Sequence, residues 1–453
     1  MKVNTQLVTK DALEIAKDNY RDYSLYVAQG RAYPNILDGC KSSYKRAIYG
    51  MWKDAPRKVV KVAELAAFAL PYHPHPTSIS GVIIQLGDES NTYKAMKTQG
   101  NWGDSSRNIE PSAERYIGGM LKDSAIALLC EGMEYCDYIT GEINNKEPIA
   151  LPALIPLCFI NGQTGIPSGL PRLNIPKMDI GSIFNYYIDI LKHKSLAYVP
   201  KTFPKPNFGT NMLSPISDWE DVLRNGKGQL TLAPTLSLDE NKIIISALPE
   251  GKNIEHVKKI LSAELSADKV DIRDESTDKI SIVVEKVYRK QCNMQDVFEK
   301  LSKKLQTNVT FNMAFFDEKN IYVPCSFDRV VKANLAYVLK VNKAKIADAL
   351  KREQRKLLIL QVIDKLKKSG LNKIFSLDEN AAINFIMSNY SCDMEIAKAV
   401  LQKPISYLTR EHLKEEKELQ LKIDELTTHN NDIWEYMLSQ YKKVKTLILS
   451  EIK

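Results

Sequence analysis

Arg115 and Tyr116 stand side by side at the end of the stretch QGNWGDSSRNIEPSAERY and are the residues most able to do chemistry. A tyrosine with an ordinary pKa near 10 is ionised in only about one molecule in a thousand at neutral pH, a deficit of roughly 4 kcal/mol for attack on a phosphodiester. A neighbouring guanidinium offsets part of this deficit and can hold the phosphate, because its fork of donors matches phosphate oxygens. The pair indicates a phosphoryl-transfer nucleophile; the alternative is a surface Arg beside a half-buried Tyr.

The elements around this pair must position it. Gly100, Asn101 and Gly103 surround Trp102, a composition typical of a loop. Upstream, two helices are predicted over residues 41–52 and 59–68, in the layout of a helix-turn-helix whose second helix enters a DNA groove.

Positive charge is concentrated on and around these two predicted helices. Between residues 31 and 61 only two acidic residues, Asp38 and Asp54, oppose the basic ones, which are Arg31, Lys41, Lys45, Arg46, Lys53, Arg57, Lys58 and Lys61. Lys and Arg in such numbers predict contacts with backbone phosphates rather than base reading. The alternative is a solvated face.

Two of the six histidines, His73 and His75, lie two residues apart among three prolines. A metal pair is conceivable, but no further His or Cys lies close in sequence to complete a ligand set. We therefore predict no metal site in this chain.

Six short segments follow one another in a fixed order. They are Gly30-Arg31-Ala32, then Asp38-Gly39-Cys40-Lys41 with Lys45-Arg46, Tyr72-His73-Pro74-His75, Gln99 to Gly103, Arg115-Tyr116, and Asn161-Gly162 with Gly165-Ile166. This order resembles the breakage-reunion subunit of type IIA DNA topoisomerases, the gyrase A and topoisomerase IV A family, in which it reads GRALP, DGLKPVHRR, YHPHGD, GQGNFG, Arg-Tyr and NGSSGIA. The chain most resembles the short, separate medium subunit of bacteriophage type II topoisomerases.

The resemblance implies roles for particular residues. Tyr116 would be the nucleophile, with Arg115, His75 and Arg31 as its catalytic partners, and the DNA contacts would be Lys41, Lys45, Arg46, His73, Gln99, Asn101 and Ile166. Family members wedge the isoleucine between base pairs; the alternative is an Ile packed on its own domain. Arg31 could instead be a cation that stabilises a helix C-terminus. Pro76-Thr77 departs from the family's Gly-Asp, which leaves the local contacts of the next helix open.

The 453 residues, 44% of them apolar, suit about three domains. The expected fold is a multidomain α+β chain: a winged-helix (helix-turn-helix) DNA-cleavage domain over 1–150, an α/β tower domain over 151–327, and a coiled coil with a C-terminal dimer gate over 328–453. We also predict a helix over 120–133, a buried strand over 151–160, a turn at Arg273 to Ser276 and a capping box at Ser376 to Glu379.

The last third is predicted to be helical. One helix is expected over 330–368, and a second begins near Thr409 and carries an apolar seam from Leu419 to Ile448 with one polar position, Asn430. In the resembling family, two such antiparallel helices joined by a small globule form the dimer gate. An intramolecular helical hairpin explains the seam equally well.

The remaining expectations concern partners. The formal charge of +8 permits double-stranded DNA as a ligand, and seven scattered cysteines suit reduced thiols in a host cytoplasm. No apolar run approaches the length of a membrane span, roughly 18 residues. No phosphate-binding loop and no stretch resembling a TOPRIM or ATPase domain is present. Mg²⁺ and ATP are therefore expected on a partner TOPRIM/ATPase subunit, without which this chain would be catalytically incomplete.

The expected activity is that of an ATP-dependent type II topoisomerase, in which a homodimer makes a transient 5′-phosphotyrosyl double-strand break through which another duplex passes. Because no DNA-wrapping β-pinwheel follows the second coiled-coil helix, relaxation or decatenation is expected rather than supercoiling. The alternative is a non-catalytic, DNA-binding architectural dimer that retains the helix-turn-helix and the coiled coil.

Overall fold

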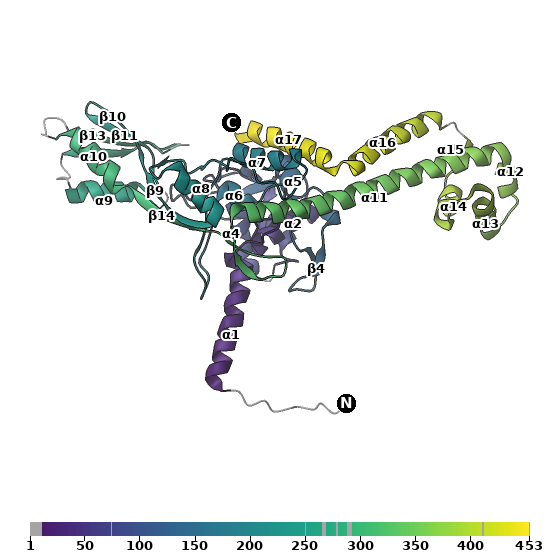
Figure 1. The fold of residues 1–453 in the computed structure, drawn as a ribbon, viewed down its shortest axis with the longest axis horizontal. Helices are drawn as coiled ribbons and strands as arrows, with labels where there is room; N and C mark the ends of the chain where they lie inside the picture. Colours follow the sequence, from purple (N-terminus) through teal and green to yellow (C-terminus); the bar gives the residue numbers. More distant parts are fainter. Residues whose placement is uncertain are drawn as a thin grey trace. The chain divides into compact units, whose positions relative to one another are not determined.

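The computed structural model describes residues 11–73, 75–249, 251–264, 269–277, 280–287, 292–409 and 412–452. The chain forms two compact units: Met1–Val338 with Gln440–Lys453, and Leu339–Ser439. Helices and strands mix in the first unit, and the described residues of the second are helical (Figure 1). The α+β class is therefore confirmed, while the division into three domains stays a prediction.

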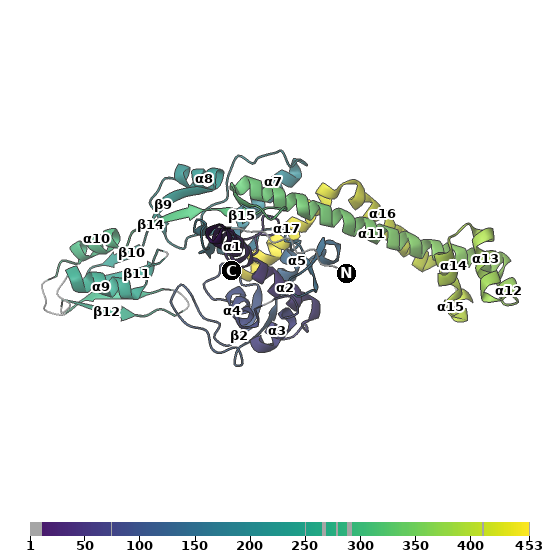
Figure 2. The same ribbon diagram turned by 90° about the horizontal axis from the view of Figure 1, so that it is seen from below.

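The first unit opens with a group of helices. They are α1 (Ala12–Val27), a π-helical turn (Ala28–Ala32), α2 (Ser42–Asp54), α3 (Val62–Ala69) and α4 (Pro76–Leu86). The predicted helix pair is confirmed by α2 and α3, which pack together with α4 (Figure 2). Ile79 and Ile83, one helical turn apart on α4, are fully buried, because residues at this spacing share the face that meets the core.

A small antiparallel sheet fixes the base of the Tyr116 loop. Its strands are β1 (Val60–Lys61), β3 (Gly118–Leu121) and β2 (Met96–Gln99), in the order β1-β3-β2. Gln99 and Gly118 face each other in the register. Residues 100–117 therefore leave and rejoin the sheet at the same place, and Tyr116 lies just before the return.

The helix predicted over 120–133 is shorter in the structure. Residues up to Leu121 pair in β3, and α5 (Asp123–Leu129) is followed by a 3₁₀ turn (Met133–Tyr135). Gly132, with φ of 90°, separates the two helical segments in a conformation that L side chains rarely adopt. The hairpin of β4 (Tyr138–Thr140) and β5 (Lys146–Pro148) follows.

The strand predicted over 151–160 is wrong, although the segment is buried as expected. It is irregular as far as Pro156 and then forms α6 (Leu157–Asn161), because Pro152 and Pro156 have no N–H to give to a ladder. Side chains satisfy its backbone instead: Tyr337 Oη donates to Ala150 O (2.9 Å), Asp38 accepts from Leu151 N (2.8 Å), Asn334 donates to Ala153 O (2.9 Å) and Tyr441 Oη donates to Leu154 O (2.7 Å).

Two further antiparallel sheets make the middle of the chain an α+β region, and the tower domain expected there stays a prediction. The five-stranded sheet has the order β6 (Gln163–Gly165), β7 (Leu173–Ile175), β14 (Thr307–Asn312), β9 (Lys227–Ala233), β8 (Asn211–Met212), and α7 (Ile180–Lys192) and α8 (Ile216–Asn225) lie between its strands in sequence. The short pair β15 (Ala314–Phe316) and β16 (Tyr322–Pro324) follows.

The four-stranded sheet has the order β10 (Thr235–Asp239), β11 (Lys242–Ala247), β13 (Ile282–Lys286), β12 (Val270–Asp274). It shares a buried apolar core with α9 (Ile254–Glu264) and α10 (Met294–Lys304). The turn predicted from Arg273 begins two residues late, because Arg273 and Asp274 still pair in β12. Arg273 forms an ion pair with Glu285 on β13.

The helix α11 (Phe327–Ser369), most of which belongs to the second unit, confirms the first long helix. The helices α12 (Leu371–Ile374), α13 (Glu379–Tyr390), α14 (Met394–Leu401) and α15 (Ile405–Thr409) form a globule whose core includes Ile363, Ile386 and Val400. Lys422 Nζ lies 3.1 Å from Glu353 Oε1, and Lys345 Nζ lies 3.3 Å from Tyr436 Oη. These two contacts show that the returning chain runs antiparallel to α11.

The predicted second long helix is divided into α16 (Leu413–Asn431) and α17 (Ile433–Ile452). Asp432 breaks it, with φ of −128° and ψ of 77°. Asp432 also caps the next helix, because its side chain accepts from the N–H of Glu435 at 3.2 Å, as an N-cap residue does. The predicted capping box is likewise displaced, because Asp378 rather than Ser376 caps α13 and accepts from Ala381 N at 2.8 Å.

Candidate functional site

Tyr116 lies in a turn with its side chain 65% exposed. Its backbone is held from two sides: its N–H donates to the carbonyl of Ala113 at 2.8 Å, and its carbonyl accepts from Lys61 Nζ at 2.9 Å. Within the described ranges its hydroxyl has no hydrogen-bond partner. A fixed backbone with an exposed, unengaged hydroxyl suits a nucleophile that attacks a macromolecular substrate.

Arg115 lies against the ring of Tyr116, with its Cζ 4.7 Å from the ring centre. This is within the range of a cation–π contact. The guanidinium is exposed and makes no ion pair with any residue that the structure describes. It can therefore stabilise a phenolate and hold a phosphate oxygen at the same time.

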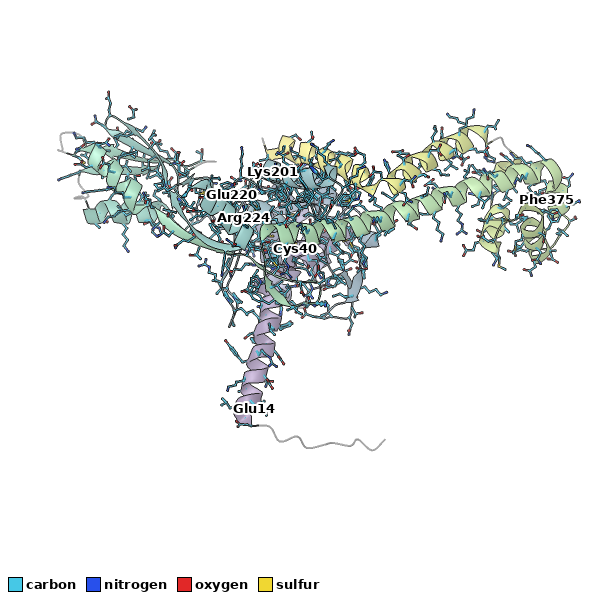
Figure 3. The ribbon with its side chains drawn as sticks, viewed as in Figure 1. Glu14, Cys40, Lys201, Glu220, Arg224 and Phe375 are labelled. Carbon is cyan, nitrogen blue, oxygen red and sulfur yellow. The ribbon has the colours of Figure 1, made fainter. Side chains whose placement is uncertain are left out.

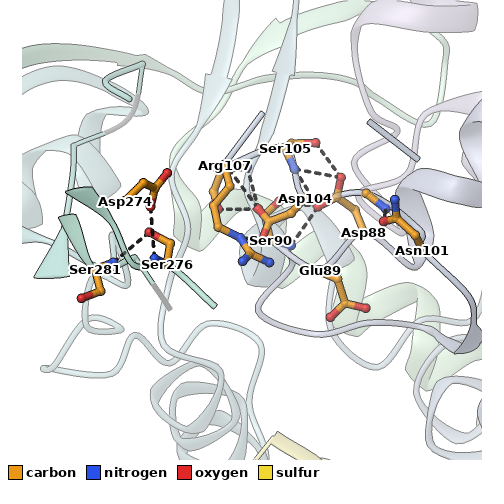
Figure 4. Close-up of polar contacts among 12 residues, drawn as sticks. Asp88, Glu89, Ser90, Asn101, Asp104, Ser105, Arg107, Asp274, Ser276 and Ser281 are labelled. Carbon is orange, nitrogen blue, oxygen red and sulfur yellow. Dashed lines mark hydrogen bonds and ion pairs between the residues drawn. The ribbon is translucent and has the colours of Figure 1, made fainter. Parts of the chain in front are cut away.

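The middle of the Tyr116 loop is fastened by two buried carboxylates (Figure 4). Asp88 accepts from the hydroxyl and the N–H of Ser105 at 2.5 Å and 3.3 Å. Asp104 accepts from Arg107 Nε at 2.6 Å. Burial alone would raise the pKa of both carboxyls. Serine hydrogen bonds lower the pKa of Asp88, and a serine hydrogen bond together with the hydrogen bonds and charge of Arg107 lowers the pKa of Asp104, so both stay ionised and hold the loop at neutral pH.

Asn101 was predicted to contact DNA, but its side chain is used inside the loop. Its Oδ1 accepts from the N–H of Gly103 at 2.9 Å, and its Nδ2 donates to the carbonyl of Glu110 at 3.1 Å. Its amide therefore closes the loop. Gln99 lies exposed at the end of β2, and its contact with DNA stays a prediction.

His73 is only 5% exposed, and its contact with DNA stays a prediction. Its Nε2 lies 3.1 Å from Ser78 Oγ, and that hydroxyl donates to the carbonyl of His75 at 3.0 Å. Because the serine has one proton, His73 must donate from Nε2. Burial, helped by the charges of Arg46, His75 and Arg31, lowers the pKa of His73 to about 4. His73 is therefore a neutral residue that positions His75, whose ring centre is 5.9 Å away.

Lys41 and Ile166 both lie at the β6–β7 hairpin. Lys41 Nζ donates to the carbonyl of Thr164 at 2.8 Å, and burial lowers the pKa of Lys41 to about 8. Ile166, two residues further on, is 82% exposed. The alternative of an isoleucine packed on its own domain is therefore wrong, and the side chain is available to a ligand.

Lys45 and Arg46 differ most from expectation, since both are buried rather than presented to a phosphate. Lys45 Nζ lies 3.2 Å from Glu147 Oε1 and donates to the carbonyl of Pro148 at 2.8 Å. Arg46 donates to Glu147 through Nε and to Glu142 through Nη2, each at 2.8 Å. Their charges are already balanced by the β4–β5 hairpin, so they fasten it to α2.

The structure sorts the predicted catalytic residues into two groups. Arg31, exposed at the end of the π turn, and His75 act electrostatically on His73. Lys61 braces Tyr116, and Arg115 lies against the ring of Tyr116. Among the residues that the structure describes, no hydrogen bond or ion pair joins Tyr116 to His75 or Arg31. The sequence analysis gave no site role to Lys61, Ser78 or Glu147. Only Lys61 carried any signal of such a role, because it belongs to the basic run between residues 31 and 61.

Comparison of the sequence with known proteins identifies the family of this chain. The sequence profile of the A subunit of DNA gyrase/topoisomerase IV matches residues 31–453. The chain belongs to this A-subunit family. It is 27% identical to the A subunit of DNA topoisomerase 4 from Haemophilus influenzae over 466 residues (96% of this chain, 60% of that protein). It is also 27% identical to the A subunit of DNA gyrase from Halalkalibacterium halodurans over 474 residues (96% of this chain, 54% of that protein).

A third relative, the A subunit of DNA topoisomerase 4 from Pseudomonas aeruginosa, is 28% identical over 279 residues, 58% of this chain and 37% of that protein. The chain thus matches roughly half of the length of these relatives. Within the part that the structure describes, no helix is both long and apolar enough to cross a bilayer. No three His, Cys, Asp or Glu side chains of the described ranges gather as metal ligands.

Proposed function

We propose that this chain is the DNA-cleaving and rejoining subunit of an ATP-dependent type II topoisomerase. The exposed, unengaged hydroxyl of Tyr116 beside Arg115 carries the proposal, together with membership of the A-subunit family. Tyr116 Oη attacks a backbone phosphorus and forms an O–P bond. The bond from phosphorus to the 3′ oxygen of the neighbouring nucleotide breaks, which leaves a 5′-phosphotyrosine and a 3′ hydroxyl. Attack by that hydroxyl reverses the reaction.

Arg115, His75 and Arg31 have different roles in this reaction. Arg115 stabilises the phenolate and then the charge on the pentacovalent phosphorus. His75 takes the phenol proton, the 3′ oxygen takes a proton from solvent water as it leaves, and Arg31 holds a phosphate oxygen. Because no hydrogen bond joins Tyr116 to His75 within the described residues, the bound phosphate is what brings their chemistry together.

DNA is held by exposed cations and bent by one apolar side chain. Arg57, Lys58 and Lys61, between α2 and α3, are exposed and can neutralise phosphates. The protruding Ile166 enters a base step, which costs a few kcal/mol of unstacking and bends the duplex. We assign these groups the DNA contacts first expected of Lys45, Arg46 and His73.

The finer parts of the proposal concern partners. Mg²⁺ and ATP are held by a TOPRIM/ATPase subunit, and no step above passes through a metal on this chain. A homodimer formed through the globule of the second unit cuts both strands, and a second duplex passes, with relaxation or decatenation as the outcome. The likeness to bacteriophage subunits and a cytoplasmic location stay predictions.

Detergent trapping tests the proposal. The full chain is mixed with its partner subunit, Mg²⁺ and supercoiled plasmid, denatured, and probed for protein on 5′ DNA ends. Tyr116→Phe should lose the covalent complex and keep DNA binding. Tyr23→Phe is the matched control, because Tyr23 is also 65% exposed. Complex that persists in Tyr116→Phe moves the nucleophile elsewhere, and its absence from the wild type favours the architectural alternative.

A further inference from the structure

Trp102 clamps both ends of the loop that carries Tyr116. Its indole is fully buried, and its single N–H donates to the carbonyls of Gln99 at 3.3 Å and Gly118 at 3.2 Å. Gln99 is the last residue of β2, and Gly118, its partner in the register, is the first of β3. One donor thus links the residue where the loop leaves the sheet to the residue where it returns.

The indole ring also fills a space made for it by two glycines. A Cβ at Gly87 would lie 2.4 Å from its Cε3, and a Cβ at Gly119 would lie 2.6 Å from its Cζ2, so no side chain fits at either place. Gly87 follows the last residue of α4, the helix that begins directly after His75. Trp102 therefore packs between the helix that follows His75 and the strand that follows Tyr116.

We propose that Trp102 is a positioning residue that fixes Tyr116 relative to the helix of His75; this rests on the proposed function. Attack on a phosphorus requires the reacting atoms to be held in near-attack geometry, and a small displacement lowers the rate strongly. Without the clamp, the ends of the loop separate more often and Tyr116 occupies more positions. The exposed cations between α2 and α3 bind phosphate independently of Trp102, so DNA affinity does not depend on the clamp.

The experiment separates the N–H from the volume of the indole. Trp102→Phe removes both the donor and part of the ring, and Trp102→benzothienylalanine keeps the shape but replaces the N–H by sulfur. Trp219→Phe is the matched control, because Trp219 is also buried and its N–H donates to one carbonyl, that of Pro204, at 2.8 Å. The readouts in the full chain are amide hydrogen exchange of residues 100–117, the rate of covalent complex at saturating DNA with the partner subunit present, and the Kd for a 40-base-pair duplex.

We expect both Trp102 variants to exchange faster in 100–117 and to form covalent complex about tenfold more slowly, the effect of losing roughly one net hydrogen bond, with the Kd unchanged within twofold. Trp219→Phe should leave all three readouts unchanged. Unchanged exchange, an unchanged rate, or a parallel loss of rate and affinity overturns the inference. If wild-type chain forms no covalent complex, or if Tyr116→Phe retains it, the proposed function fails, and the exchange result alone then decides whether Trp102 clamps the loop.

Discussion

Lys61 Nζ donates a hydrogen bond to the backbone carbonyl of Tyr116 at 2.9 Å, across 55 residues of sequence. Lys61 is the last residue of β1 and faces Gly118, the first residue of β3, in the register. Its side chain therefore reaches the turn before β3, in which Tyr116 lies. Lys61 is also exposed, so its charge can attract the phosphates of DNA that approaches the turn. Lys61 thus has two roles to separate, bracing the turn and attracting DNA.

Lys61→Met should separate these roles, because it keeps the aliphatic stem and removes the ammonium. We expect the rate of covalent complex formation at saturating DNA to fall about fivefold, since one hydrogen bond is worth roughly 1 kcal/mol. Lys58→Met is the matched control: it removes an exposed charge three residues away without touching Tyr116. Equal rates for the two variants would show that Lys61 acts only as a charge.

The salt dependence of DNA binding should come from the exposed cations between α2 and α3. Arg57→Gln with Lys58→Gln should reduce the slope of log K against log salt by about 1.8, or about 0.9 for each phosphate that is no longer neutralised. Lys442→Gln with Lys443→Gln removes the same exposed charge from α17 and should leave the slope unchanged. Filter binding of one duplex at several salt concentrations measures both, and equal slopes for the two double variants would mean that the turn after α2 faces away from DNA.

The sequence predicted the elements better than the use of their side chains. Helices α2, α3 and α11 follow from apolar spacing, which is a local property. Glu147 lies 101 residues from Arg46, and no local pattern distinguishes a lysine or arginine that will find a buried carboxylate from one that will face a phosphate. The strand predicted over 151–160 was wrong for a similar reason. Distant side chains such as Asp38 bind its backbone in place of the hydrogen bonds of a β-sheet, which an apolar run predicts.

The buried ion cluster on α2 should make Glu147 important for stability. Glu147 is 2% exposed and is shared by Lys45 and Arg46, so Glu147→Gln leaves two buried cations without their shared counter-charge. We expect the free energy of unfolding to fall by about 3–5 kcal/mol. Glu89→Gln, which breaks the partly exposed pair with Lys94, should change it by less than about 1 kcal/mol. Urea unfolding measures both; similar small losses would show that the α2 cations are compensated elsewhere.

Stability should fall in mild acid because of His73. Its folded pKa of about 4 lies below the ordinary value of 6.5, so its contribution is complete above pH 6.5 and is lost as the pH falls toward 4, where the unfolded chain binds a proton that the buried ring does not. His73→Gln should therefore lose less stability than wild type between pH 7 and 5, measured by urea unfolding.

Asp38 titrates in the same window with the opposite sign. Burial raises its pKa to about 6, above the ordinary value of 3.8, so its contribution is complete below pH 3.8 and is lost as the pH rises through 6. Because wild type and His73→Gln both keep Asp38, its effect cancels in the difference between their free energies of unfolding. Parallel pH profiles for wild type and His73→Gln would show that His73 is not held neutral.

The globule of the second unit should join two copies of the chain. Many of the globule's apolar side chains are buried in its own core, among them Ile383, Ile386, Ile396 and Val400. Met394, at 52% exposure, remains outside, together with Phe375 at 58% and Leu377 at 39% (Figure 3 labels Phe375). A twofold contact between two globules would cover these exposed side chains, with the same surface used on both copies. It would also keep two Tyr116 residues in one particle, as double-strand cleavage requires.

Sedimentation of the full chain at micromolar concentration tests this interface. Phe375→Asp with Met394→Glu puts charges on two of the exposed apolar side chains of the globule, and burying these charges unpaired would cost several kcal/mol, so the double variant should be monomeric. Leu213→Asp with Ile216→Glu is the matched control, because these side chains are equally exposed, at 54% and 58%, but belong to the first unit. If both double variants sediment like the wild type, or if the control alone dissociates, the two copies do not meet through the globule. The interface that brings two Tyr116 residues together must then be sought in the first unit.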